Sequence, residues 1–419
     1  MPLRPPLPPP VTTAGPEPSP QRSADSSGTA AGVPTAEATI TGGSPDGSSL
    51  PAVPGAAAPG GFARLPSLTG LRWLAAFMVW GYHLGIVNPT VNENLAPFFR
   101  AVSKGAIGVS FFFVLSGFVL VWSFRPRDTT SAFLRRRFAK IYPNYAFSLL
   151  CALIVLAVTG GVVSGWSVLT NVLLINSWFL TDGFPNAINL VAWTLCCEAF
   201  FYVTLPYVLP RLRRLSTERL YVWLAGLPVA ALLVNAAAGE ALPGKAALYF
   251  GFFPPTRYHE FLAGVIVGVL VVRGRWAGPG LWPSTALVVA VYTAHSWVDV
   301  SVVVPVAFAA LIAAAAAADV QGRSSPWRWR PMVVLGEASY AFYLMHFLVM
   351  TTAVHVLGRL EGQRGFFFGE QPLLGGAGLF LGGTMTVTLL IALPMYYWLE
   401  RPMMRVLRPG TARRKPPAE

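Results

Sequence analysis

The stretch LPSLTGLRWLAAFMVWGYHLG, residues 65–85, places two ionisable side chains, Arg72 and His83, inside a run that is otherwise mostly apolar. A run of about 20 apolar residues is long enough to cross the hydrocarbon core of a bilayer as a helix. Ionisable groups at that depth are costly, and where they occur they commonly serve function. The stretch therefore predicts a membrane helix and indicates where to look first for chemistry.

The rest of the chain has the composition of a polytopic membrane protein. Of its 419 residues, 54% are hydrophobic and only 12% are charged. We count ten apolar runs, most of them about 17 to 25 residues long, which is the length of a membrane span. We therefore predict an all-α fold, a polytopic bundle of about ten transmembrane helices. The runs begin near Pro66, Ala106, Tyr145, Leu190, Leu220, Tyr258, Leu281, Ser301, Val333 and Gly375.

Basic residues indicate the direction of these helices. Clusters such as Arg135–Lys140, Arg211–Arg219 and Arg323–Arg330 follow every second run. Because basic connections stay on the cytoplasmic side, both termini are predicted to be cytoplasmic. A shorter run, Trp166–Leu180, would invert this pattern if it crossed, so we expect it to re-enter the membrane or to lie on its surface.

The two ends of the chain differ from the middle. Residues 1–62 are rich in Pro, Ala, Gly and Ser and are predicted to be a disordered cytoplasmic tail without a signal peptide. Residues 63–405 would form the membrane domain, and residues 406–419 a basic tail. The net charge of +13 does not predict a nucleic-acid partner, because the basic residues lie beside apolar runs. The three cysteines show no metal-ligand spacing, so no metal is expected.

Arg72 and His83 are eleven residues apart, which places them on one helix face with His83 roughly 16 Å further along the axis. That arrangement suits a ligand with an anionic end in the cytoplasm and a reactive end within the membrane. The alternative is that Arg72 reaches to lipid phosphate while His83 only bonds a neighbouring carbonyl group.

Polar residues recur in other runs. Ser339, Tyr343 and His346 form a stripe along the ninth run, which we expect to line a cavity, although isolated polar residues also join helices. Glu198 lies within a span, one turn before Tyr202, and must be neutral or have a partner. That partner could be Arg257, which could instead pair with Glu260. Ser116 could donate a hydrogen bond into a cavity or bond its own helix.

Seven segments together resemble the acyltransferase-3 family of integral membrane O-acyltransferases. Any one of them is weak evidence, but they occur in the family's order and extend from Leu65 to about Arg405. They are SLTGLRWLAAFMVWGYHLG, GVSFFFVLSGFVL, RRRFAKIYPNY, WTLCCEAFFYVTLP, RYHEFLAG, LGEASYAFYLMH and YYWLERP.

The resemblance implies ten membrane helices and transfer of an acyl group, often acetyl, from cytoplasmic acyl-coenzyme A to a hydroxyl of a sugar-bearing acceptor. It implies that His83 and Arg72 are the functional pair, and it places Glu198, Arg257 and His346 in other family motifs. The motif at Glu198 reads WTLCCE where many relatives have Trp-Ser-Leu before two varied residues and Glu. The extracellular esterase-like domain of some members is missing, so this chain would complete transfer alone or with a partner.

Together these observations predict an O-acyltransferase in a bacterial cytoplasmic membrane. No bound cofactor is expected, and acyl-coenzyme A would be a co-substrate. The acceptor would be a macrolide-type glycoside or a surface glycan, with membrane lipids around the protein. We predict His83 as general base, oriented by Glu198 or His346, and substrate contacts from Arg72, Arg257, Tyr343 and Ser116; a covalent acyl-enzyme relay stays open. The alternatives are a glycolipid transporter that uses buried ionisable residues as a proton relay, and a scaffold without catalysis.

Overall fold

The computed structural model describes residues 64–87, 93–125, 129–179, 187–242, 250–361 and 374–406, and every regular element within them is a helix. The predicted N-terminal tail, 1–62, lies outside these ranges. So does the predicted basic tail beyond Val406. The all-α prediction is confirmed for the described part of the chain.

A helix coincides with each of the ten predicted runs. Seven segments in the described residues are long and apolar enough to cross a membrane, and two further apolar helices, α10 and α11, are shorter. The helix that carries Arg72 and His83, α1, is not among those seven. The ten helices are α1 (Pro66–Val87), α3 (Gly108–Trp122), α4 (Thr130–Thr159), α6 (Trp193–Leu212), α7 (Thr217–Ala241), α9 (Tyr258–Val272), α10 (Leu281–Ala294), α11 (Val304–Val320), α12 (Arg330–Glu361) and α13 (Leu374–Pro394).

Shorter helices connect or extend them. Between α4 and α6 the described chain forms α5 (Gly165–Val172) and a single turn, Asn176–Trp178. Eight helical residues rise only about 12 Å, far less than the hydrocarbon core, so α5 is too short to cross as a helix. Other short elements include α2 (Ala96–Val102), a π-helical turn (Met395–Glu400) that continues α13, and α14 (Arg401–Val406).

The ends of several helices follow from local sequence. The Thr129 hydroxyl accepts a hydrogen bond from the Ala132 backbone N–H at 3.2 Å and caps the start of α4. Gly160 ends the same helix in the left-handed region, with φ at 78°, where a residue without Cβ is least strained. Ser216 caps α7 in the same way as Thr129 caps α4.

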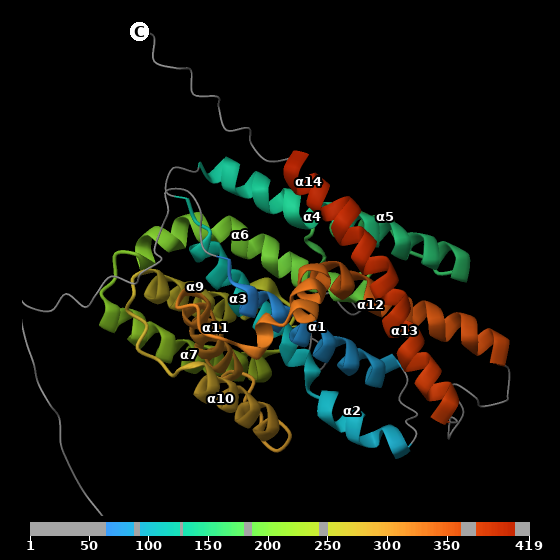
Figure 1. Ribbon diagram of the computed structural model, residues 1–419. Coiled ribbons are helices and arrows are strands. Elements are labelled where there is room, and N and C mark those ends of the chain that lie inside the picture. The colour runs from blue at the N-terminus through green and yellow to red at the C-terminus, as the bar shows by residue number, and fades with distance from the viewer. Residues whose placement is uncertain are drawn as a thin grey trace, which may run out of the picture. The chain divides into compact units, whose positions relative to one another are not determined.

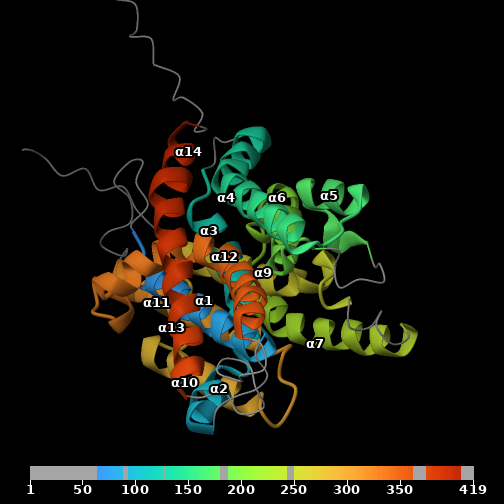
Figure 2. The same ribbon diagram turned by 90° about the vertical axis from the view of Figure 1, so that its right-hand side faces the viewer.

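Helix α1 lies within the bundle, packed against α12, α3 and α11 (Figures 1 and 2). Close approach depends on glycine. A Cβ on Gly336 of α12 would lie 1.8 Å from the Thr69 carbonyl oxygen of α1, and one on Gly264 of α9 would lie 1.8 Å from the Val114 carbonyl oxygen of α3. Gly264 therefore permits the close packing of α9 on α3, and Gly336 permits the close crossing of α1 and α12, the two helices that carry the histidines.

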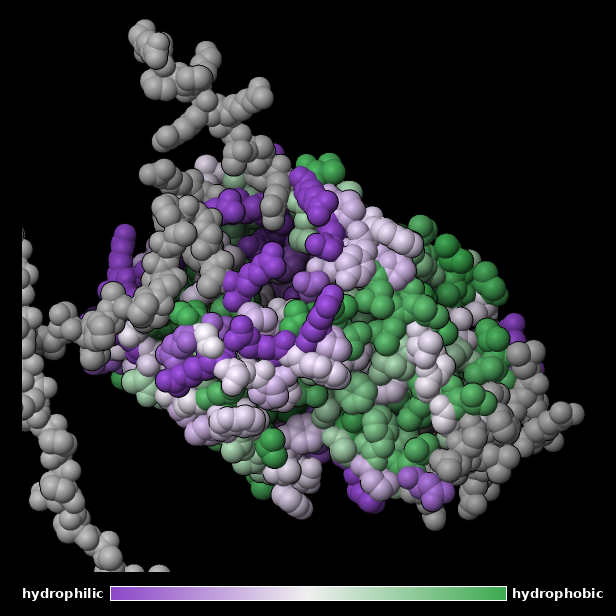
Figure 3. Space-filling model, in the orientation of Figure 1, coloured by the Kyte–Doolittle hydropathy of each residue, from purple (hydrophilic) through white to green (hydrophobic). Residues whose placement is uncertain are grey.

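The surface is divided by polarity. On the face shown in Figure 3, hydrophilic side chains gather towards α14 and border a hollow in the region of α4 and α6, while hydrophobic side chains cover the side of α12 and α13. An apolar belt beside a polar end is the surface that a bilayer requires of a helical protein.

Candidate active site

Two histidines from different helices meet inside the bundle. Nδ1 of His83 on α1 lies 2.9 Å from Nε2 of His346 on α12, and the ring centroids are 5.0 Å apart. His346 is fully buried, with Phe342 stacked against it, and Phe347 packs edge-on to His83. The structure thus brings together two predicted catalytic residues that are 263 positions apart in the chain.

Backbone contacts determine where the protons lie in this pair. Nδ1 of His346 is 2.7 Å from the Tyr343 carbonyl oxygen, which can only accept, so Nδ1 carries the proton. In the neutral ring Nε2 of His346 is then an acceptor, and Nδ1–H of His83 donates to it. The lone pair of His83 is therefore on its Nε2, the atom that can remove a proton from a substrate.

Charged side chains form a second group nearer the basic ends of the helices. We call Arg72, Arg137, Lys140, Glu198 and Glu400 the charged cluster. They come from α1, α4, α6 and the π-helical turn, and they interact electrostatically with one another. Along α1, Arg72 and the histidine pair are separated by roughly 16 Å, as the sequence predicts.

Glu198 belongs to the charged cluster. Its Oε2 accepts a hydrogen bond from the Tyr202 hydroxyl at 2.8 Å, and the Ser116 side chain in turn hydrogen-bonds Tyr202. Of the two residues predicted to orient His83, the structure pairs His346 with it and gives Glu198 these other partners. Ser116 thus hydrogen-bonds a residue of a neighbouring helix, and its predicted contact with substrate stays a prediction.

Arg257 has the local partner that was one of its two predicted alternatives. Its Nη2 lies 3.0 Å from Oε1 of Glu260 and 3.3 Å from the Ser110 hydroxyl, which donates to the same carboxylate at 3.0 Å. Its guanidinium also lies over the ring of Phe113, 5.7 Å from the centroid. Arg257 therefore joins α9 to α3 and is not the ion-pair partner of Glu198.

The polar residues predicted to form a stripe on α12 bond backbone groups. The Ser339 hydroxyl donates to the Gly336 carbonyl of its own helix at 2.8 Å, and the Tyr343 hydroxyl donates to the Val191 carbonyl at 3.3 Å. Both hydroxyls thus donate to backbone carbonyls, and the cavity expected beside the stripe stays a prediction. Tyr343 instead supports the site through its carbonyl, which holds His346.

No role was predicted for Glu400, whereas Lys140 belongs to the Arg135–Lys140 basic run, which together with Arg72 could hold phosphate. Oε2 of Glu400 accepts from the Asn144 side chain at 2.8 Å, and the carboxylate interacts with Lys140 and Arg72. Glu400 ends the π-helical turn, a local irregularity that is common at functional sites. The only sequence signal was its place in YYWLERP, one of the segments that carry the family resemblance.

The chain is similar to known acyltransferases. The family model described as an acyltransferase domain, acyltransferase-3, matches residues 65–393. A Streptomyces mycarofaciens protein named acyltransferase MdmB is 34% identical over 380 residues, which cover 85% of this chain and 94% of that protein. The exopolysaccharide production protein ExoZ of Rhizobium meliloti strain 1021 is 27% identical over 326 residues, 74% of this chain and 92% of that protein.

No solved structure matches the chain. The family match covers well over half of the residues and includes both histidines and all of the charged cluster except Glu400. The relative of Streptomyces mycarofaciens is similar over nearly its whole length. The chain belongs to the acyltransferase-3 family and is an O-acyltransferase with several apolar helices of membrane-spanning length.

Proposed function

We propose that this enzyme moves an acetyl or other short acyl group from acyl-coenzyme A to a hydroxyl of a sugar-containing acceptor. The observation that carries the proposal is the placement of a histidine pair deep in the bundle, roughly 16 Å along α1 from Arg72, which interacts electrostatically with Lys140 in the charged cluster. A pantetheine arm is about as long as half a bilayer. Phosphates held at Arg72, Arg137 and Lys140 would therefore place the thioester near His83.

The chemistry needs a base at the thioester. Nε2 of His83 removes the proton from the acceptor hydroxyl while the hydroxyl oxygen attacks the thioester carbonyl carbon. The carbon–sulfur bond then breaks, and the coenzyme A thiolate takes up the proton from the His83 imidazolium. His346 acts through His83: its Nε2 holds Nδ1–H of His83 and keeps the free lone pair directed at the substrate.

The proposed class of acceptor is based on the proteins and the family that this chain resembles. One curated relative is named for exopolysaccharide production, and the family resemblance includes enzymes that modify macrolides and surface glycans. We propose a macrolide glycoside or a related sugar-bearing product as acceptor.

The test is transfer of label. Purified protein in detergent is given acetyl-coenzyme A labelled in the acyl group together with a panel of macrolide glycosides and exopolysaccharide fragments. A labelled ester in the acceptor, formed by the wild type and not by His83→Ala, supports the proposal. A transporter reconstituted in liposomes would move the glycoside without consuming the donor, and that result would refute it.

We also propose that all ten helices cross a bacterial cytoplasmic membrane and that both termini are cytoplasmic. The described basic residues at the ends of α6, α9 and α11 support this orientation, because each such end would then face the cytoplasm. Single cysteines placed at Arg213 and at Ser296, in a variant without the three natural cysteines, distinguish the sides. A membrane-impermeant thiol reagent added to whole cells should label only the cysteine at position 296, and labelling at 213 would contradict the topology.

A further inference from the structure

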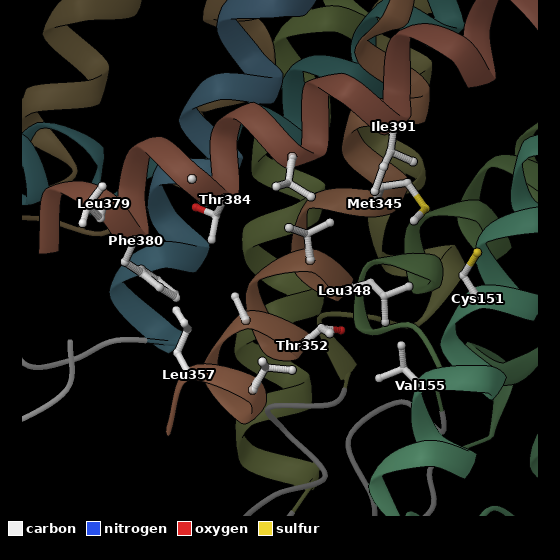
Figure 4. Close-up of a pocket in the computed structure, with 15 residues that line it drawn as sticks. Cys151, Val155, Met345, Leu348, Thr352, Leu357, Leu379, Phe380, Thr384 and Ile391 are labelled. Atoms are coloured by element: carbon white, nitrogen blue, oxygen red, sulfur yellow. The ribbon is translucent and has the colours of Figure 1, made fainter. Parts of the chain in front are cut away.

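The bundle also has an apolar groove whose lining includes no residue of the charged cluster. It has a volume of about 560 Å³ and lies between α4, α12 and α13. Figure 4 shows Cys151 and Val155 on one wall, Leu348 and Thr352 in the middle, and Phe380 opposite. The lining is almost entirely apolar, and the hydroxyl of Thr384 is bonded to the Leu381 carbonyl of its own helix.

A second hollow of about 380 Å³ continues this groove along the same helices. The two share Val155, Thr352 and Val356, and the second ends at Arg359 and His355 in the last turns of α12. The Arg359 side chain is exposed. Nε2 of His355 is buried and has no hydrogen-bond partner within the described residues. One end of the continuous groove is thus apolar. The other end has a cationic side chain and a ring nitrogen that lacks a hydrogen-bond partner within the described residues.

The length of the groove matches one leaflet of a membrane. From Met345 at its deep end to Arg359 at its mouth is 14 residues, or roughly 21 Å of helix. Half the thickness of a bilayer with its headgroups is roughly 20 to 22 Å. The mouth lies at the end of α12 opposite to Arg328 and Arg330, so the leaflet is the one on the non-basic side.

We propose that this groove is a binding site for an anionic phospholipid, with an acyl chain along α12 and the headgroup phosphate at Arg359 and His355. The chain itself supplies little selectivity, because it leaves one hydrocarbon environment for another. Preference must come from the polar mouth, where a basic residue near the surface is worth about 1 kcal/mol towards an anionic lipid. The site is separate from the histidine pair and does not depend on the acceptor or donor assigned above.

The structure offers substitutions that test the two ends of the groove separately. Gly383 lines the groove, and a Cβ there would meet nothing within 4 Å, so Gly383→Leu should fill the space without displacing backbone. Gly226→Leu on α7 is the matched control, since a Cβ at that exposed glycine also meets nothing. At the mouth, Arg359→Gln removes the cation, and Arg100→Gln on α2 is its control at an exposed arginine outside the groove.

The experiment uses the full chain, stripped of lipid in detergent and titrated with phosphatidylglycerol or phosphatidylcholine of identical chains, with bound lipid counted by native mass spectrometry. We expect one phosphatidylglycerol per chain, bound more tightly than phosphatidylcholine. Arg359→Gln should reduce that preference roughly fivefold, the ratio that corresponds to about 1 kcal/mol. Gly383→Leu should abolish the stoichiometric lipid, and both controls should behave as wild type.

Three results would overturn the proposal. One is equal binding of the two lipids to the wild type, and another is equal lipid binding by Gly383→Leu and Gly226→Leu. The third is a wild-type groove that takes up no lipid because another group fills it, either Phe366–Phe368 of the same chain or the sugar-bearing acceptor. Lipid uptake that appears after deletion of 366–368 would identify the chain's own segment as the occupant. Competition with a macrolide glycoside would identify the acceptor.

Discussion

The histidine pair and the charged cluster both include a residue of α1, but their polar groups have different partners. His83 and His346 bond to each other, and the Tyr343 backbone carbonyl fixes the proton of the second ring. The charged cluster draws three basic and two acidic side chains from four elements, which interact mainly through charge. The histidine pair thus holds the Nε2 lone pair of His83 in one direction. The charged cluster instead has more positive than negative side chains and can bind a large anion.

This contrast predicts different kinetic consequences. A group that acts only in the transition state changes kcat, whereas a group that holds a substrate equally in ground and transition states changes KM. Variants of the histidine pair should therefore lower kcat, and variants of the charged cluster should raise the KM for the acyl donor.

The largest effect is expected at His83. His83→Ala should lower kcat about a thousandfold, within the usual range for loss of a general base. His346→Ala should lower it only about ten- to a hundredfold, because His83 remains but is no longer oriented. In the double variant kcat should fall no further than in His83→Ala alone, since the two act as a unit. The measurement is kcat for acyl transfer, with a monodisperse elution profile as the check on folding. If the double variant instead showed the combined kcat losses of the two single variants, the two histidines would act independently.

The next largest effect is expected when one cation is removed from the charged cluster. Lys140→Met should raise the KM for acyl-coenzyme A about tenfold and leave kcat nearly unchanged, because a charge-assisted hydrogen bond to phosphate contributes about 1.5–3 kcal/mol. Arg219→Gln, at an exposed arginine on α7, is the control and should change neither constant. If Lys140→Met lowered kcat while the donor KM stayed the same, the donor phosphates would have to bind elsewhere.

A smaller effect on kcat is expected from a change at the crossing of α1 and α12, the helices that carry the histidine pair. In Gly336→Ala the new Cβ would overlap the Thr69 carbonyl, so α1 and α12 must move apart. We expect a several-fold loss of kcat and a loss of stability of about 1–3 kcal/mol, as for other overpacked sites. Gly358→Ala on the same helix meets open space and should have neither effect. Thermal unfolding in detergent and kcat would be measured together; a stability loss without any change in kcat would show that the histidine contact tolerates the shift.

Much of this could be predicted from the sequence, for identifiable reasons. Apolar run length located the helices, and helical periodicity placed Arg72 and His83 on one face, because both depend on neighbours in the chain. The sequence could not choose between His346 and Glu198 as partner of His83, since that depends on which helices cross. Periodicity also could not show that the Ser339 hydroxyl bonds its own helix.

Glu400, the one member of the charged cluster without a predicted role, was hard to predict for a related reason. Glu400 and Asn144 are 256 positions apart, and no local pattern joins them. The π-helical turn that ends at Glu400 also shifts the helical register, so a regular 3.6-residue period would not place its side chain correctly. The pairing of Arg257 with Glu260 was local and therefore among the predicted alternatives, whereas the pairing of α4 with the C-terminal turn was not.

The smallest expected effect has the opposite sign to that of Lys140→Met. In Glu400→Gln the amide oxygen can still accept from Asn144, but the negative charge beside Lys140 and Arg72 is lost. The cluster then attracts phosphate more strongly, so the donor KM should fall by up to about fivefold, or roughly 1 kcal/mol. The free protein should at the same time unfold at a lower temperature, because two half-buried cations have lost a counter-charge. Titration of the donor at two salt concentrations measures the first effect, which should shrink as salt screens the cluster. A rise in the donor KM would instead mean that Glu400 contacts the donor itself. The assignment of catalysis to the histidine pair and of donor binding to the charged cluster would then be wrong.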